Sequence, residues 1–209
     1  KLSRLTRNSL IIAFFFLVDK VLAFVRTGII SRQYSDSVHM LDTFNAANNL
    51  PDVLFALISG GALAMAFIPL LTEYLTTKDR AAAWDLFSRV ANVAFLVTGS
   101  FAILIAIFAQ PIVDAKLGIA PGFDQEQRTL LAELMRLNLI GTVIFSISGL
   151  VMASLQANQH FIFPAMAPSM YNIGQIFGAI FLVPAYGVHG LVYGVIIGAA
   201  MHLLIQLPM

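Results

Sequence analysis

The sequence predicts an all-α integral membrane protein, folded as a bundle of six transmembrane helices. Of its 209 residues, 59% are hydrophobic and 11% are charged, whereas about 25% of the residues of a soluble domain are charged. Residues 137–209 contain no Asp, Glu, Lys or Arg. Because one helical span needs about 20 apolar residues, that stretch alone has room for three spans.

The apolar stretches place the six expected spans at residues 8–32, 40–76, 90–113, 128–157, 161–184 and 190–209. The second span is expected to be one long helix that is broken twice. Pro51 removes a backbone donor and clashes with the preceding turn, and Gly60 and Gly61 form a second weak point, so we predict these three residues as hinges. The charged residues 77–89 around Trp84 are expected to lie at the membrane interface.

The distribution of basic residues predicts that both ends of this chain lie in the cytoplasm. With both ends on one side, that side carries Lys1, Arg4, Arg7, Lys78, Arg80 and Arg89, and the other carries Arg32, Lys116, Arg128 and Arg136. An excess of Lys and Arg marks the cytoplasmic side. Because the chain begins with Lys rather than Met, we expect a trimmed or partial chain.

Composition disfavours several other classes of function. A net charge of +1 gives no field that would attract nucleic acid, and without cysteine there is no disulfide or thiolate metal site. The four histidines are too far apart to form a helical ligand pair, so no metal or other cofactor is expected. Ser146 and Ser148 precede His189 and His202, but a hydrolase needs Ser–His contact and oxyanion donors; we expect no catalytic residue and no enzyme.

The first candidate site consists of Asp19, Lys20 and Arg26 within the first span. Charges inside a span cost about 2.5–3.5 kcal/mol each on insertion, and Asp19 and Arg26, seven residues apart, share one helix face. One interpretation is a mutually neutralised structural pair. The functional interpretation is a water-filled cavity that holds an anion or phosphate, with the Arg26 guanidinium as the donor.

The second candidate site is a polar stripe on the second span. Steps of three and four residues put its members on one helix face; they are Asp42, Asn45, Asn48, Asn49 and Asp52. Such a stripe cannot face lipid. It either bonds neighbouring helices or lines a cavity that contacts a polar headgroup.

Glycines at four-residue spacing predict close helix packing in the last two spans. Gly174 and Gly178 form one pair, and Gly190, Gly194 and Gly198 form a run. Small faces of this kind let helices approach closely, and glycine has no side chain that could carry chemistry, so these faces are expected to be structural.

A series of short motifs runs from about residue 9 to the end of the chain. They are Lys20-Val-Leu-Ala-Phe-Val-Arg26, Asp42, Asn49-Leu-Pro-Asp52, Gly61-Ala-Leu-Ala-Met-Ala-Phe-Ile-Pro69, Glu73-Tyr74, Ala120-Pro-Gly-Phe123, Phe163-Pro-Ala-Met-Ala-Pro168, Asn172-Ile173 and Gln206-Leu-Pro208. In order and spacing this series resembles the MurJ (MviN) family of lipid II flippases, within the multidrug/oligosaccharidyl-lipid/polysaccharide exporter superfamily.

The resemblance implies a two-lobed transporter in which residues 1–209 form the N-terminal six-helix lobe and the second lobe is absent from this chain. The substrate site of such parallel repeats lies between the lobes. The implied activity moves lipid II, an undecaprenyl-pyrophosphate-linked cell-wall precursor, from the inner to the outer leaflet of the bacterial cytoplasmic membrane. The implied partners are this precursor, membrane lipid and the second lobe. Arg26 and Asp42 match cavity positions of the family.

The sequence departs from the family at the basic pair that usually follows the Leu-Pro-Asn motif. Here those positions are Phe55 and Ala56, Gly60 replaces an acidic residue, and Lys20 stands where the family has Arg. Arg forks are natural partners of phosphate, so two alternatives stay open: a flippase for another polysaccharide-linked lipid, or a non-transporting membrane scaffold derived from the same fold.

Overall fold

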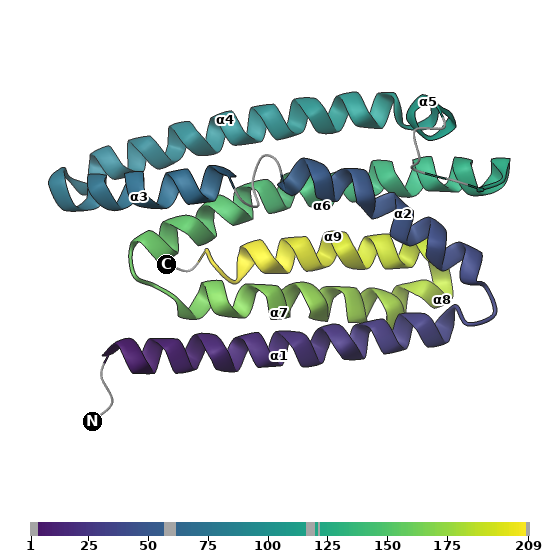
Figure 1. The fold of residues 1–209 in the computed structure, drawn as a ribbon, viewed down its shortest axis with the longest axis horizontal. Helices are drawn as coiled ribbons and strands as arrows, with labels where there is room; N and C mark the ends of the chain where they lie inside the picture. Colours follow the sequence, from purple (N-terminus) through teal and green to yellow (C-terminus); the bar gives the residue numbers. More distant parts are fainter. Residues whose placement is uncertain (1–3, 57–61, 116–119, 121, 208–209) are drawn as a thin grey trace.

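The computed structural model describes residues 4–56, 62–115, 120 and 122–207, and within these residues it is helical with no strand (Figure 1). The predicted all-α fold is therefore confirmed. The elements in chain order are α1 (Arg4–Gln33), α2 (Val38–Phe55), α3 (Ala62–Thr77), α4 (Arg80–Ile107), α5 (Ala109–Asp114), α6 (Gln125–Ala157), α7 (Ile162–Phe177), the π-helix η2 (Gly178–Leu182), α8 (Val183–Tyr186) and α9 (Val188–Leu204).

The helix count differs from six because three of the predicted spans are broken. The second span becomes α2 and α3, which follow each other along the long axis of the molecule (Figure 1). The third becomes α4 and α5, and the fifth becomes α7, η2 and α8. A π-helical widening just before Pro184 has a physical cause, since proline cannot donate to the preceding turn and its ring clashes there.

Three helical stretches in the described residues are long and apolar enough to cross a membrane: Arg80–Ile107, Gln125–Ala157 and Ile162–Tyr186. Val188–Leu204 is also apolar but shorter. The outer side of α4 carries exposed Leu96, Phe101 and Ile103, an apolar surface that suits contact with lipid.

Residues 80–89 form the first turns of α4 and not a separate surface segment. The helix begins there because the Asp79 side chain caps it, accepting a hydrogen bond from the backbone N–H of Ala82 at 2.7 Å. Trp84 is 69% exposed and stacks on Phe87, and Lys78 lies over the ring of Tyr74. Such aromatic and basic side chains are typical of a membrane–water interface.

The helices form two groups that meet at α6 and α9. In one group α7 packs against α1 and α9, and in the other α6 packs against α2, α3, α4 and α5. Contacts of α6 and α2 with α9 join the groups. The core at this junction includes Leu131, Leu134, Met135, Leu191 and Val192, all almost fully buried.

The predicted glycine packing between the last two spans is confirmed. A Cβ atom built on Gly174 would lie 2.3 Å from the Cα of Gly198, and one on Gly178 would lie 2.5 Å from the Cα of Gly194. On Gly190 it would meet the backbone of Leu182 at 2.5 Å. The two helices therefore touch backbone to backbone, a distance that only glycine allows.

The arrangement in Figure 1 makes the predicted topology testable. The start of α1, the end of α9 and the α3–α4 connection lie at one end of the molecule, and the α1–α2 connection, the start of α6 and α8 lie at the other. If the first end is cytoplasmic, cysteines placed at Asp36, Gln125 and Tyr186 should be labelled from outside the cell. Labelling of a cysteine at Gln125 from the cytoplasm only would contradict this topology.

Candidate functional site

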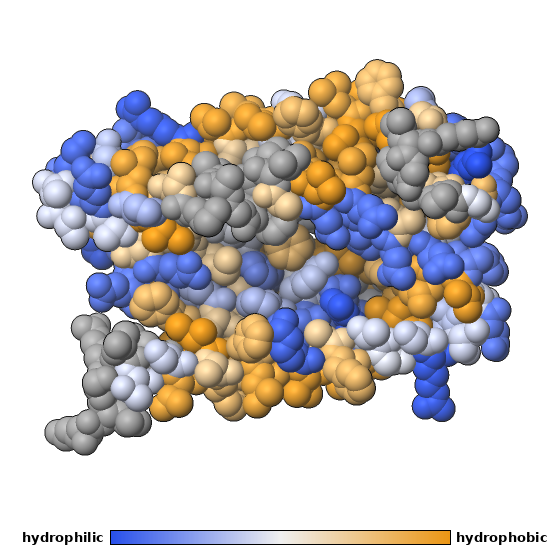
Figure 2. Space-filling view, viewed as in Figure 1, coloured by the Kyte–Doolittle hydropathy of each residue, from blue (hydrophilic) through white to orange (hydrophobic). Residues whose placement is uncertain are grey.

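A cavity of about 340 Å³ lies between α1, α2 and α7. Its described lining from α1 is Arg26, Thr27, Ile30 and Ser31; from α2 it is Leu41, Phe44, Asn45, Asn48 and Asp52; from α7 it is Tyr171 and Gln175. The cavity thus combines the two candidate sites of the sequence with a third helix. Figure 2 shows hydrophilic side chains along the middle of the same face of the molecule, between apolar surfaces on either side.

Arg26 and Asp52 are the charged side chains among the described residues that line this cavity. Arg26 is partly buried and Asp52 is exposed. Neither forms an ion pair with another described residue. A guanidinium and a carboxylate without partners are costly within a membrane bundle, so this site requires water, a ligand or another protein surface to satisfy them.

Two residues of the cavity, Tyr171 and Gln175, come from α7 and did not belong to either candidate set. Gln175 is only 6% exposed, and its Nε2 has no hydrogen-bond partner in the described part of the structure. Both lie four residues apart on one face of α7. The sequence signal was weak, since the polar residues of α7 are scattered among apolar ones and form no stripe like that of α2.

Helix periodicity explains which members of the α2 stripe reach the cavity. At about 100° per residue, Asn45, Asn48 and Asp52 fall within about 60° of one another. By the same period, Asn49 and Asp42 lie about 40° and about 60° from Asn45, on the side away from Asn48 and Asp52. Both are exposed and do not line the cavity. Asn48 also donates to the backbone oxygen of Phe44 in its own helix at 2.9 Å.

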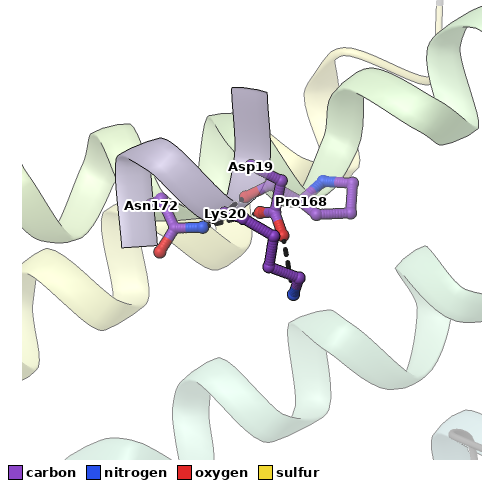
Figure 3. A network of polar contacts seen from close by, with 4 residues as sticks. All are labelled: Asp19, Lys20, Pro168 and Asn172. Carbon is purple, nitrogen blue, oxygen red and sulfur yellow. Dashed lines mark hydrogen bonds and ion pairs between the residues drawn. The ribbon is translucent and has the colours of Figure 1, made fainter. Parts of the chain in front are cut away.

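Asp19 and Lys20 lie outside the cavity, and Asp19 joins α1 to α7 (Figure 3). Asp19 is 8% exposed; it accepts a hydrogen bond from Asn172 Nδ2 at 2.7 Å and forms an ion pair with Lys20 at 3.2 Å. Asn172 also donates to the backbone oxygen of Pro168 at 3.4 Å. This network compensates the buried carboxylate, so its immediate role is to hold the two helices together.

Of the predicted hinge residues, Pro51 is buried within α2, which stays helical to Phe55. Gly60 and Gly61 lie outside the described residues.

The structure also brings Ser148 of α6 into contact with His202 of α9. The hydroxyl oxygen lies 2.6 Å from His202 Nδ1, and Gln206 Nε2 donates to the same hydroxyl at 3.0 Å. Ser148 is fully buried, and His202 and Gln206 are nearly so. Because Ser148 lies within α6, the backbone N–H groups around it already bond within the helix and are not free to stabilise an oxyanion. The triplet is a polar contact between helices.

Comparison with known proteins identifies the family. The family model of the lipid II flippase MurJ matches residues 37–209. The chain belongs to the MurJ family. A probable lipid II flippase MurJ of Buchnera aphidicola subsp. Acyrthosiphon pisum is 30% identical over 196 residues, which cover 92% of this chain and 38% of that protein.

Two further MurJ proteins agree with this assignment. The lipid II flippase MurJ of Burkholderia cenocepacia is 27% identical over 208 residues, covering 98% of this chain and 40% of that protein. A solved structure of lipid II flippase MurJ in an inward closed conformation matches with a TM-score of 0.75 and 24% identity, covering 95% of this chain and 42% of that chain, so the fold is shared. The chain spans about two fifths of the length of these relatives.

Their names describe flippases, which are transporters and not enzymes. Three described helical stretches are long and apolar enough to cross a membrane, which agrees with membership of this family of membrane transporters. The family resemblance stated from the sequence is thus confirmed, and the names of the relatives agree with the expected transporter class.

Thiol labelling distinguishes a hydrated stripe from a packed one. Cysteines replacing Asn45 and Asn49, in this cysteine-free chain, should react with a charged, water-soluble maleimide, because both positions are exposed on the polar face. Two controls should stay unreactive: Ser146→Cys, which is fully buried, and Leu96→Cys, which is exposed on the apolar side of α4. Equal reactivity at Leu96 and Asn45 would show that the stripe is no more hydrated than the lipid-facing surface.

Proposed function

We propose that this chain, residues 1–209, forms the N-terminal lobe of a two-lobed MurJ transporter in the bacterial cytoplasmic membrane, with both ends in the cytoplasm. The complete transporter moves lipid II from the inner to the outer leaflet for cell-wall synthesis. The observation that carries this proposal is the cavity between α1, α2 and α7, in a chain of the MurJ family. It contains amide groups and a guanidinium that forms no ion pair within the described part of the chain.

The physical task of a flippase explains the features of this cavity. A polar headgroup cannot enter the hydrocarbon layer, because each unsatisfied polar group there costs several kcal/mol. Asn45, Asn48 and Gln175 offer hydrogen bonds in place of water, and Arg26 offers a fork of donors to an anionic oxygen. The lipid tail stays in the surrounding bilayer while the headgroup moves through the protein.

The hydrophilic face in Figure 2 suits contact with a second lobe. Parallel repeats place their substrate between lobes, and Asp42 and Asn49, which are exposed and lie outside the cavity lining, belong to the same helix as its lining residues Asn45 and Asn48. We assign Arg26, Asn45 and Asp52 to headgroup contact. We assign Asp19 and Lys20 to the positioning of α1 beside the cavity, and Pro51, Gly60 and Gly61 to bending of the second span during alternating access.

Complementation tests the proposed function. The complete reading frame, expressed in a bacterial strain depleted of its own lipid II flippase, should restore growth and prevent lysis. The matched control is the same reading frame with a stop codon after Met209, which should fail to complement because the second lobe is missing. Normal membrane expression of the complete protein without restored growth would contradict lipid II transport.

The replacement of the family's basic pair by Phe55 and Ala56 favours one second candidate, a flippase for a different polysaccharide-linked lipid. Fewer cations would suit a headgroup with fewer negative charges. Growth restored only in a strain that lacks another lipid-linked sugar flippase would establish this candidate in place of the first.

A further inference from the structure

We propose that Gln175 determines specificity by contacting the uncharged, hydroxyl- and amide-bearing part of the lipid-linked headgroup, next to the anionic group at Arg26. This inference rests on the proposed function and deepens it. It assigns to α7 a role in binding the sugar and peptide portion of the substrate. The charged residues of α1 and α2 do not explain how that portion would be recognised.

The first observation is the state of the Gln175 side chain. It is 94% buried, lines the cavity, and its Nε2 has no hydrogen-bond partner among the described residues. Buried amide groups are nearly always hydrogen-bonded, and leaving one unsatisfied destabilises the fold. The unpaired Nε2 of Gln175 at the cavity wall is explained if a bound ligand supplies an oxygen that accepts its hydrogen bond.

The second observation is the balance of charge in the cavity. Among the described lining residues, the positive charge of Arg26 is matched by the negative charge of Asp52. An ionised carboxylate only accepts hydrogen bonds, so a ligand that binds beside Asp52 is favoured if it donates hydrogen bonds. A pyrophosphate offers acceptor oxygens and no donor, whereas sugar hydroxyls and amide N–H groups donate.

The third observation is the neutral character of the remaining wall. Asn45, Asn48 and Gln175 carry amides that both donate and accept, and Tyr171 adds a phenol ring. Rings of this kind present a flat apolar face with a polar tip. Paired donors and acceptors beside an aromatic ring suit an amidated sugar better than a second anion.

The test compares two lipids that share the pyrophosphate and differ in the rest of the headgroup. Binding of lipid II and of undecaprenyl pyrophosphate to the purified complete protein is measured by native mass spectrometry, for wild type and Gln175→Leu. Loss of one hydrogen bond should weaken lipid II binding about five- to tenfold, and the affinity for undecaprenyl pyrophosphate should not change. Equal weakening of both lipids, or of neither, would overturn the proposal.

The melting temperature of Gln175→Leu provides a second test. A ligand-binding role predicts an unchanged or higher melting temperature, whereas a purely structural role predicts a lower one. Replacing an unpaired buried amide by a similar apolar side chain should leave the melting temperature of Gln175→Leu unchanged or higher. The control is Gln206→Leu, which removes an amide bonded to Ser148 Oγ and the backbone oxygen of His202; it should lower the melting temperature. A lowered melting temperature in Gln175→Leu would also overturn the proposal, because the amide would then be a structural group.

The outcomes separate this inference from the proposed function. If wild-type protein binds neither lipid, lipid II transport itself fails. If wild type binds lipid II and Arg26→Ala abolishes that binding while Gln175→Leu does not weaken it, the transport proposal stands and the role of Gln175 is refuted.

Discussion

Replacing Arg26 by alanine is expected to abolish complementation of a flippase-depleted strain while the protein still reaches the membrane at normal levels. Arg26 lines the cavity and has no ion-pair partner among the described residues, so its loss breaks no internal contact that would unfold the bundle. Each charge-assisted hydrogen bond contributes about 1.5–3 kcal/mol. A two-pronged contact with an anionic oxygen therefore accounts for roughly 100-fold or more in affinity.

Two further variants sharpen this prediction. Arg26→Lys should restore growth only in part, because an ammonium keeps the charge but lacks the planar fork. Arg32→Ala is the matched control, since Arg32 belongs to the same helix but is exposed at its end and does not line the cavity; it should support normal growth. Full growth with Arg26→Ala would contradict a role of Arg26 in binding the headgroup.

Replacing Gly174 by alanine, or Gly194 by leucine, should prevent the bundle from folding. Added side-chain atoms would overlap backbone atoms of the opposite helix: Gly174 lies against Gly198, and a Cβ on Gly194 would be 2.9 Å from the Cα of Gly178. Backbone cannot move aside as a flexible side chain can, so α7 and α9 would have to separate. We expect loss of the monodisperse peak on size-exclusion chromatography in detergent and a strongly lowered melting temperature.

Gly99→Ala is the matched control for these substitutions. Gly99 is also helical, in α4, but a Cβ there would meet nothing within 4 Å. Alanine is favoured over glycine within a helix by about 0.5–1 kcal/mol, so this variant should be as stable as wild type or more so. A folded Gly174→Ala protein with an unchanged melting temperature would contradict the close packing of α7 on α9.

Local rules made part of this fold predictable from the sequence. The charge-free stretch, the spacing of Gly174 and Gly178, and the proline positions each depend on residues close together in the chain. They predicted the membrane bundle and its closest helix contact. The start of α6 at Gln125 was not predicted, although Asp124 and Gln127 form a capping box there, because polar residues at that point also suit a loop.

The composition of the cavity was harder to predict because it depends on how distant helices meet. Periodicity placed five polar residues on one stripe of α2, but only contact with α1 and α7 decides which of them line the cavity. Asn172 satisfies Asp19 although the two are 153 residues apart. Nothing local to either residue predicts that pairing, and the same holds for the presence of Gln175 and Arg26 in one cavity.

The most direct test of the central claim is protection of the cavity by its substrate. A cysteine replacing Asn45, on the cavity wall, is treated with a water-soluble maleimide in the purified complete protein, with and without lipid II. We predict that lipid II slows the reaction markedly, that an ordinary phospholipid does not, and that Arg26→Ala removes the protection. Unchanged reactivity of the Asn45 cysteine at lipid II concentrations that saturate binding would contradict the assignment of this cavity to the headgroup.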